Sequence, residues 1–348
     1  MNEPTSLREI SDCITDHRRV AVAGARTKPR LSRASADATL MSLAKYTGIT
    51  DYQASEFTIV VRAGTPMAEV IATLAERGQY LPFDPLWVKR GATVGGTIAA
   101  NASGPGRIRF GGIRDFIIGA TVIDGRGQSL RSGGKVVKNA AGFDTPKFMV
   151  GTLGRWGAIA EATFKVFPRP PYSASRIWQC ADHEEARQRI AQVARSRWEP
   201  TAIEYLPKER QIWVRLSGPE KAANGLLEDV GGEPGPSEAD WAAYNELTWA
   251  DNPGSLIRVP LSLNIMPTLL AELESPDHRL RVGGAGSTLW INSADDCEIE
   301  SVLRRHHLKG LNHRDNAAPL RWGVWRDQKV DRALQAVFDP DHRFTAFC

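Results

Sequence analysis

The sequence is poor in cysteine and in long apolar runs. Four cysteines occur in 348 residues, Cys13, Cys180, Cys297 and Cys348, and none forms a CxxC pair. We therefore expect a reduced cytoplasmic setting, and neither a zinc ribbon nor a cysteine-ligated iron–sulfur cluster within this chain. No stretch of 18 apolar residues is present, so we expect no membrane span. The first residues lack the apolar core of a secretory signal, and we expect none.

An excess of charge of one sign is also missing. Lysine and arginine number 44 and aspartate and glutamate 40, a net charge of +4, and no run of five like charges occurs. This pattern does not predict a nucleic acid partner. With 42% apolar and 24% charged residues, the composition is that of a soluble globular protein long enough for two or three domains.

Several common cofactor and catalytic motifs are absent. Residues 104–106 read Gly-Pro-Gly, but Arg109 stands where the third glycine of a GxGxxG fingerprint belongs. Residues 132–135 end like a P-loop, yet Val136 replaces the Ser or Thr that would bind magnesium. Neither HExxH nor GxSxG occurs. We therefore do not expect a Rossmann dinucleotide site, a P-loop, a zinc peptidase or an α/β-hydrolase.

Glycine is concentrated in one region. Twelve of the 31 glycines fall between Gly91 and Gly134, and residues 91–104, GATVGGTIAANASG, are small at almost every position. Such a segment can lie against a large flat ligand with its backbone N–H groups free to donate. It can equally form a Gly/Ala-rich turn and a tightly packed helix start. The residues alone leave both interpretations open.

The first half of the chain alternates between short strands and a helix. A helix is predicted over residues 65–77, with Thr65 as N-cap and Pro66 at the first helical position. The stiff segment at residues 168–171 predicts a domain boundary. Strands are predicted at residues 19–23, 57–63, 116–124 and 158–166.

The second half predicts an α+β domain with an antiparallel sheet, in which a β-α-β-β order occurs about twice. Residues 218–236 are rich in Gly and Pro and predict a loop. Helices are predicted at residues 182–195, 266–273 and 295–306, and strands at 175–180, 202–206, 211–216, 256–261, 279–282 and 287–291.

Three segments carry a resemblance to a known family. They are residues 91–127, the KNAAGFD of residues 138–144, and residues 151–170, GTLGRWGAIAEATFKVFPRP. In order and spacing they resemble the FAD-binding domain of vanillyl-alcohol oxidase and p-cresol methylhydroxylase (PCMH)-type flavoproteins. Residues 51–85 and KNAAGFD are further similar to the FAD-binding (E) subunits of glycolate oxidases.

The resemblance implies an α+β fold in three parts. A PCMH-type FAD-binding domain of two subdomains would occupy residues 1–170, and a ferredoxin-like antiparallel-sheet cap domain would occupy residues 171–320. Residues 321–348 would form a C-terminal segment that returns to the FAD domain.

The resemblance also implies a FAD site. Residues 24–28 take the place of a pyrophosphate loop, whose consecutive backbone N–H groups bind an anion. Ala25 and Arg26 replace glycines there, and Arg26 would either pair with phosphate or crowd the loop. The loop offers no His or Cys for covalent attachment, so we expect noncovalent FAD. The implied FAD-contacting residues are Gly24, Ala25, Arg26, Thr27, Lys28, Pro82, Ala92, Thr93, Val94, Gly95, Gly96, Ala99, Asn101, Ser103, Gly104, Gly111, Asp115 and Ile159.

Some of these residues have a plain structural alternative. Asp115 is either an acid of the FAD site or a turn acid, and Ile159 is either a flavin contact or part of a strand core. Lys135 and Lys138 would lie near the flavin by resemblance, or would form a solvated turn.

The chain lacks the HGHxGDGNxH motif with which D-2-hydroxyacid dehydrogenases of the same family hold substrate and metal. It has His306, His307 and His313 instead, without an accompanying acid cluster. We expect solvated or turn histidines there, no metal site, and we name no catalytic base.

By resemblance, the function is that of the FAD-binding subunit of a 2-hydroxy-acid (glycolate) oxidase complex that oxidises glycolate to glyoxylate. A sister flavoprotein subunit would carry the substrate chemistry, and an iron–sulfur subunit would pass the electrons on. The location would be cytoplasmic, either free or peripheral to the inner membrane through partners. Two alternatives stay open: a self-sufficient FAD-dependent alcohol or hydroxy-acid oxidoreductase, and a non-enzymatic assembly subunit that has lost FAD.

Overall fold

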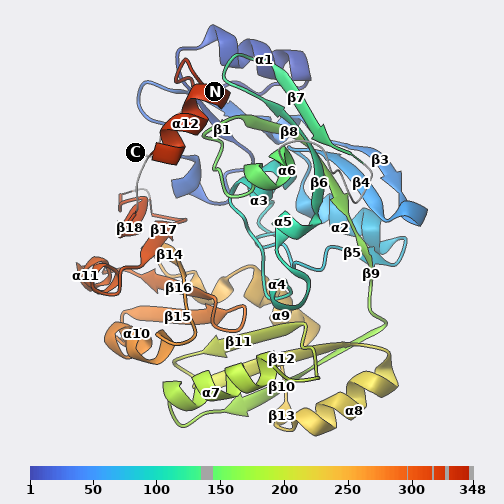
Figure 1. Cartoon of the computed structure of the whole chain (residues 1–348), viewed down its shortest axis with the longest axis vertical. Coiled ribbons are helices and arrows are strands. Elements are labelled where there is room, and N and C mark those ends of the chain that lie inside the picture. Colours follow the sequence, from blue (N-terminus) through green and yellow to red (C-terminus); the bar gives the residue numbers. More distant parts are fainter. Residues whose placement is uncertain (135–143, 296, 316, 326–328, 345–348) are drawn as a thin grey trace. The chain divides into compact units, whose positions relative to one another are not determined.

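The structure is a computed structural model that describes residues 1–134, 144–295, 297–315, 317–325 and 329–344 (Figure 1). The chain divides into two compact units. The first comprises Met1–Ser103, Gly112–Arg169 and Arg326–Cys348, and the second comprises Gly104–Gly111 and Pro170–Trp325. The sequence had assigned residues 104–111 to the FAD-binding domain, whereas here they pack with the second unit. Lys135 and Lys138 lie outside the described residues.

A five-stranded antiparallel sheet, ordered β3-β4-β8-β6-β7, forms the centre of the first unit. Its inner strands are rich in β-branched residues, which favour a pleated and buried backbone. The strands predicted at residues 57–63, 116–124 and 158–166 are confirmed as β4, β6 and β8, respectively. The strands are β3 (Ile49–Gln53), β4 (Thr58–Arg62), β6 (Ile117–Ile123), β7 (Ser129–Gly133) and β8 (Ala158–Lys165).

Two small sheets and several short helices complete this unit. The predicted N-cap Thr65 is wrong by one residue, because Pro66 caps the helix and the Thr65 Oγ1 accepts a hydrogen bond from the Gly48 N–H at 2.9 Å. The sheets pair β1 (Val20–Ala23) in parallel with β2 (Thr39–Ser42), and β5 (Gln79–Tyr80) with β9 (Phe167–Pro168). The helices are α1 (Leu7–Asp16), α2 (Met67–Ala75), α3 (Val94–Ala99), α5 (Ile113–Phe116) and α6 (Thr145–Met149), with 3-10 turns η1 (Pro29–Ser32), η2 (Leu43–Lys45) and η3 (Ala54–Glu56).

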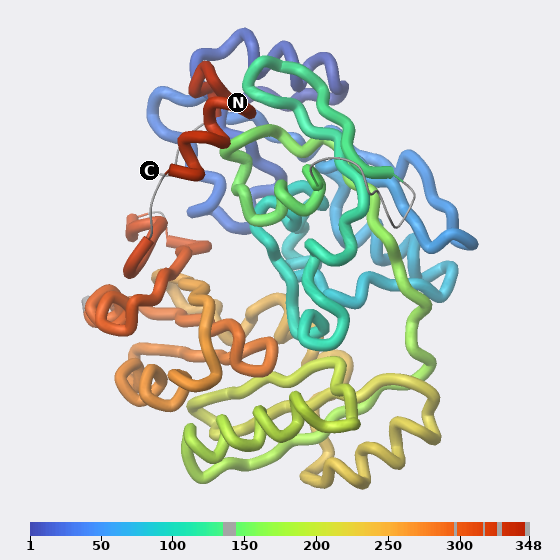
Figure 2. The backbone as a smooth tube through the Cα atoms, in the orientation of Figure 1, coloured from blue at the N-terminus to red at the C-terminus, as the bar shows by residue number. Residues whose placement is uncertain are grey.

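The C-terminal segment packs into the first unit. Helix α12 (Lys329–Phe338) is followed by a turn in which the fully buried Asp339 carboxylate accepts hydrogen bonds from the N–H groups of Arg343 and Phe344. The Phe338 carbonyl accepts from the Gly125 N–H, and Phe344 pairs with Val20 of β1. Because Asn2 bridges Met41 of β2, the described ends of the chain flank the two-stranded β1–β2 sheet, and Figure 2 shows the red C-terminal segment beside the blue N-terminal part of the chain.

The second unit is built on a nine-stranded antiparallel sheet, ordered β13-β10-β12-β11-β15-β16-β14-β17-β18. Its elements follow a β-α-β-β-α-β order twice, which confirms the predicted repeat. The strands are β10 (Tyr172–Gln179), β11 (Ala202–Leu206), β12 (Gln211–Gly218), β13 (Glu233–Pro234), β14 (Ser255–Pro260), β15 (His278–Gly283), β16 (Thr288–Ser293), β17 (Lys309–Asn312) and β18 (Arg321–Gly323). The helices are α4 (Arg107–Phe110), α7 (His183–Ala194), α8 (Glu220–Val230), α9 (Glu238–Asn245), α10 (Met266–Leu273) and α11 (Cys297–Arg305), with one 3-10 turn, η4 (Thr248–Ala250).

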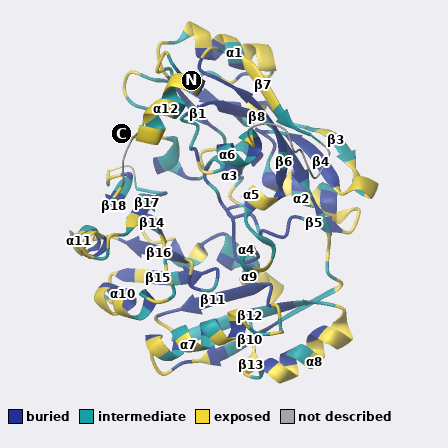
Figure 3. Cartoon of the chain, in the orientation of Figure 1, coloured by how far each residue is buried: buried dark blue, intermediate teal, exposed yellow. Residues whose placement is uncertain are grey.

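The loop predicted over residues 218–236 is wrong, because α8 occupies most of it. Ala223, Leu227 and Val230 follow helical spacing and are buried, so the helix has a core-facing stripe. The glycines and prolines that suggested a loop lie mainly at its ends, apart from Gly225. Figure 3 shows that α7 and α8 bury one face and expose the other, while β11, which follows α7 in the chain, is buried along its whole length.

A buried carboxylate connects three elements of the second unit. Glu204 of β11 is 2% exposed, and its Oε2 accepts a hydrogen bond from the Tyr244 hydroxyl of α9 at 2.5 Å. Its Oε1 accepts from the Gly284 N–H in the turn after β15 at 3.0 Å. Burial raises the pKa of Glu204 to about 7, against the two hydrogen bonds and the charges of Arg215 and Arg107.

Candidate cofactor site

The loop that follows β1 has an unusual backbone. Residues 24–28 leave the strand at Ala23 and lead into η1. Arg26 has a φ of +56°, the left-handed region that glycine adopts most easily. Its side chain is exposed. Arg26, at a position where the resemblance implies glycine, therefore keeps the left-handed backbone conformation of a glycine and adds a guanidinium at the surface.

Small residues let this loop approach helix α3 closely. Thr93 caps α3, and its Oγ1 accepts a hydrogen bond from the Gly96 N–H at 3.3 Å. A Cβ at Gly24 would lie 2.2 Å from that oxygen, so residue 24 must be glycine for the loop to pack here. Within α3, a Cβ at Gly95 would lie 2.8 Å from the Cβ of Ala63, just beyond β4.

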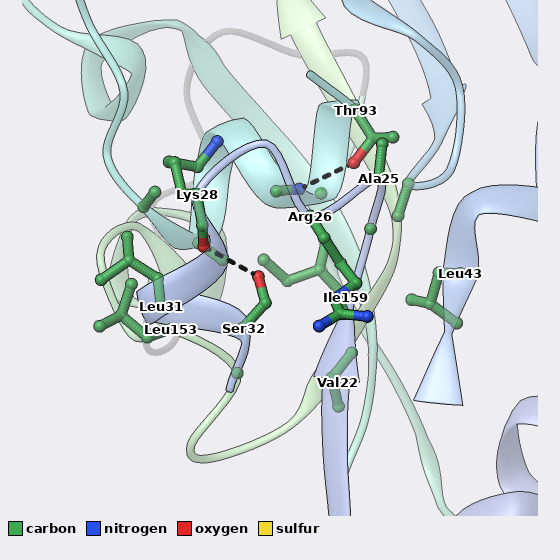
Figure 4. A pocket seen from close by; sticks show the side chains of 18 of the residues that line it. Val22, Ala25, Arg26, Lys28, Leu31, Ser32, Leu43, Thr93, Leu153 and Ile159 are labelled. Atoms are coloured by element: carbon green, nitrogen blue, oxygen red, sulfur yellow. Dashed lines mark hydrogen bonds between the residues drawn. The ribbon is translucent and has the colours of Figure 1, made fainter. Parts of the chain in front are cut away.

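These elements enclose an open pocket with an empty volume of about 660 Å³, its mouth included. Figure 4 shows the side chains around it, with Thr93 and Ala25 at one part and Lys28, Leu31 and Ser32 at another. The lining residues are Val22, Ala23, Gly24, Ala25, Arg26, Thr27, Lys28, Leu31, Ser32, Leu43, Ala63, Thr93, Gly95, Gly96, Ala99, Ala100, Leu153, Gly154, Gly157 and Ile159.

The pocket is electrostatically suited to an anion. Arg26 and Lys28 both line it, and none of the described lining residues is acidic. Lys28 is only 6% exposed, and its Nζ donates to the Thr27 Oγ1 at 3.0 Å. Two cations in a partly enclosed site create a positive potential that attracts a phosphate or carboxylate.

Ten of the eighteen residues predicted to contact FAD line this pocket. They come from the β1 loop, from α3 with its cap, and from β8. The ten are Gly24, Ala25, Arg26, Thr27, Lys28, Thr93, Gly95, Gly96, Ala99 and Ile159.

The other eight predicted residues do not line this pocket, and their contact with FAD stays a prediction. The Ser103 Oγ accepts from the Ile113 N–H at 2.9 Å, and the exposed Asp115 caps α5 by accepting from the Gly112 N–H at 2.9 Å. Gly104 and Gly111 belong to the second unit. Their role toward FAD stays a prediction, as it does for the buried Pro82, Ala92 and Val94 and for Asn101, which has a left-handed backbone.

Half of the lining residues were not among the predicted FAD contacts. Leu43 directly follows β2 and Ala63 directly follows β4, and both line the pocket. An apolar residue next to a strand is as typical of a protein core as of a pocket wall, so the sequence did not mark these two. Gly154 and Gly157 lie in the GTLGRWGAIAE segment that carried the family resemblance. Gly154 has a left-handed φ of +74°, which glycine adopts more easily than any other residue, so a glycine is favoured at this position.

Of the expected solvated or turn histidines, His313 lies in a bend after β17, but it is buried rather than solvated. His313 is 1% exposed, and its ring lies 5.1 Å from that of Trp290. His306 contacts Glu272 through Nε2 at 2.8 Å, and His307 lies in the turn after α11 with a left-handed φ of +52°. Within the described part of the chain, no three His, Cys, Asp or Glu residues form a group that could hold a metal ion.

Comparison with known proteins shows the family. The chain is 32% identical to glycolate oxidase subunit GlcE of Escherichia coli (strain K12) over 348 residues, which cover 97% of this chain and 96% of that protein. The chain belongs to the GlcE family. Residues 2–133 also match the family described as FAD binding domain, so this GlcE-family chain is a FAD-linked oxidoreductase subunit.

More distant relatives share one part of the chain. It is 27% identical to glycolate oxidase subunit GlcD of Bacillus subtilis (strain 168) over 183 residues, 51% of this chain and 39% of that protein. It is 33% identical to D-2-hydroxyglutarate dehydrogenase of Xanthomonas citri pv. viticola over 176 residues, 49% of this chain and 37% of the relative. The chain therefore spans well under half the length of these two relatives.

Solved structures confirm the predicted fold. Two structures of alkyldihydroxyacetonephosphate synthase superpose with TM-scores of 0.70 and 0.72 at 15% identity, over 97% of this chain and 75% of theirs. The fold is thus the expected α+β type, a PCMH-type FAD-binding domain with an antiparallel-sheet cap. Among the described helices, none has the length and apolar character needed to cross a bilayer.

Proposed function

We propose that this chain binds FAD noncovalently in the pocket beside residues 24–28, as the FAD-binding subunit of a 2-hydroxy-acid oxidase complex. The observation that carries the proposal is a cationic pocket, lined in part by Gly and Ala residues, in a chain similar to GlcE along almost its whole length. Among the described lining residues there is no His, Cys or Tyr, which supports noncovalent binding.

The lining residues divide by the part of a dinucleotide that they suit. Lys28 and Arg26 supply positive charge for the diphosphate, together with the backbone N–H groups of residues 24–28. Val22, Leu153 and Ile159 offer apolar surface for a ring system. When bound, FAD supplies a two-electron acceptor for the oxidation of an alcohol carbon.

We assign the oxidation of glycolate to a complex of this chain with partner subunits. Oxidation of glycolate to glyoxylate removes two electrons and two protons, one of them together with both electrons as a hydride. The cysteines of this chain are too scattered to ligate an iron–sulfur cluster. We therefore assign electron transfer to an iron–sulfur subunit and substrate binding to a sister flavoprotein subunit, in the cytoplasm or at the inner membrane surface through those partners.

The first test is FAD binding by the purified chain. After incubation with FAD and removal of the free FAD by desalting, we expect the chain to retain flavin absorbance. Ala99→Phe places a ring in the pocket from α3 and should abolish this retention, whereas Ala222→Phe on the exposed face of α8 should not. A chain that stays colourless with FAD would support the assembly-subunit alternative and contradict the proposal.

The second test is glycolate oxidation. The complex formed by co-expression with the two partner subunits should oxidise glycolate and reduce an artificial acceptor, while the isolated chain should not. Turnover of glycolate or another alcohol by the isolated chain would instead establish a self-sufficient oxidoreductase.

A further inference from the structure

A buried lysine and a buried tryptophan meet beside the pocket. The Lys28 Nζ lies 4.9 Å from the centroid of the Trp87 ring, and the two residues are 6% and 2% exposed. Lys28 lines the pocket, whereas Trp87 does not. An ammonium over an aromatic face is attracted by the ring's quadrupole, and the attraction grows when water is excluded.

The backbone of Trp87 is held in an unfavourable conformation. Its φ is +60°, a left-handed value that is rare for a bulky side chain and costs free energy. Neighbouring hydrogen bonds fix this conformation, because the Trp87 carbonyl accepts from the Ala92 N–H at 3.1 Å and the Leu86 N–H donates to the Ala102 carbonyl at 3.4 Å. The Gly/Ala-rich segment of residues 91–104 thus holds the ring in place.

We propose that Trp87 is a positioning residue, which holds the Lys28 ammonium at the pocket wall so that its charge meets the diphosphate of a bound dinucleotide. This inference rests on the proposed FAD site. A lysine stem is flexible and loses rotamer freedom when its ammonium binds an anion. The ring restricts the ammonium beforehand and attracts it without using any of its three N–H donors.

A purely structural role makes a different prediction. If Lys28 only packed against Trp87, loss of the ring would lower stability and weaken every ligand of the pocket alike. If Trp87 positions a charge, its loss weakens a ligand with phosphates and leaves riboflavin, which has none, unaffected. The salt dependence of binding separates the two roles further, because only the charge contact is screened by salt.

The experiment measures dissociation constants of FAD and riboflavin by flavin fluorescence, for flavin-free protein at low and high salt. Trp87→Leu removes the ring and Trp87→Phe keeps an aromatic ring. Both replacements must adopt the same left-handed backbone conformation at residue 87, so its cost in free energy is common to the two variants. Lys28→Met removes the charge, and Arg126→Met, in the exposed turn after β6, is the control for one lost charge. Thermal unfolding of each variant verifies folding.

We expect Lys28→Met and Trp87→Leu each to raise the dissociation constant of FAD by about tenfold or more and to flatten its salt dependence. Trp87→Phe should stay within about threefold of the unaltered chain, because a ring is retained. Riboflavin binding should be unchanged throughout.

Two results with the variants would overturn the inference. One is a Trp87→Leu chain that binds FAD as tightly as the unaltered chain, with the same salt dependence, which would leave the proposed function intact. The other is an equal loss of FAD and riboflavin, which would assign Trp87 a structural role. If the unaltered chain bound no FAD at all, the proposed function itself would fail, and the inference with it.

Discussion

At the scale of single residues, the candidate site depends on positions where only one kind of side chain fits. Gly24 is the clearest, because its missing Cβ makes room for the Thr93 hydroxyl. The residue type was visible in the sequence, but its partner, 69 positions further along, was not. Close approach between distant segments is a property of the folded chain.

Gly24→Ala should therefore destabilise the first unit. The added Cβ would lie 2.2 Å from the Thr93 Oγ1, and relief of that overlap moves the loop or the α3 cap, at a cost of about 1–3 kcal/mol. Denaturant unfolding measures the change. The matched control is Gly225→Ala in α8, where a Cβ meets nothing within 4 Å and helix propensity predicts a gain of about 0.5–1 kcal/mol. Equal effects at both positions would contradict the packing argument.

Glu204 should make the stability of the second unit depend on pH. Burial raises its pKa from the ordinary 4.5 to about 7, so the folded chain keeps a proton that the unfolded chain releases in this range. Its contribution to stability is fully present below pH 4.5 and is lost as the pH rises toward 7, by on the order of 3 kcal/mol.

Glu204→Gln removes this titration. Denaturant unfolding of the variant between the two pH values should show a smaller decline than that of the unaltered chain. The exposed Glu220→Gln is the control for a lost surface charge. Parallel pH profiles for Glu204→Gln and the unaltered chain would show that Glu204 does not titrate in this range.

At the scale of elements, the sequence predicted those whose pattern agrees with their surroundings. Strands β4, β6 and β8 are short β-branched runs that lie in a buried sheet, so local propensity and packing point the same way. Helix α8 was missed because the Gly and Pro around it outweighed a weak apolar stripe. Its burial against the sheet of the second unit, rather than its own propensity, makes it a helix.

Helix α3 provides a prediction at this scale. Thr93→Val keeps the side-chain shape but removes the oxygen that accepts from the Gly96 N–H, and should destabilise the first unit by about 1 kcal/mol. Because Thr93 and Gly96 line the pocket, FAD binding should weaken as well. Thr93→Ser restores the cap and should recover both properties. Flavin titration and denaturant unfolding test this, and a Thr93→Ser chain as weak as Thr93→Val would exclude the capping explanation.

At the scale of the whole molecule, the two units differ in how the chain builds them. The described part of the second unit is mostly one stretch with a repeated order of elements, which explains why its architecture could be read in advance. The first unit draws on segments from both ends of the chain. Its completion therefore depends on contacts of the largest sequence separation, such as Val20 with Phe344.

Removal of the C-terminal segment should consequently weaken the first unit. A chain that ends at residue 325 loses the pairing at Val20 and the Phe338 carbonyl that accepts from Gly125. We expect its first unit to unfold at a lower denaturant concentration. Asp339→Ala is a milder variant, which leaves two N–H groups without their acceptor and should cost about 1–3 kcal/mol. The exposed Asp341→Ala is its control, and unchanged unfolding of the truncated chain would refute the dependence.

The sequence by itself determined the classes of protein to exclude, the inner strands β4, β6 and β8 of the first unit's sheet, the repeat of the second unit, and the segments that suggested a flavin site. These follow from local periodicity and from glycine, whose role can be read without a partner. Only the tertiary structure decided that Lys28 meets Trp87, that Thr93 faces Gly24, and that Ala92 and Val94 are buried rather than in the pocket. The reason is that a close approach between segments is fixed by the packing of the whole unit, and the type of a residue does not specify which distant residue it contacts.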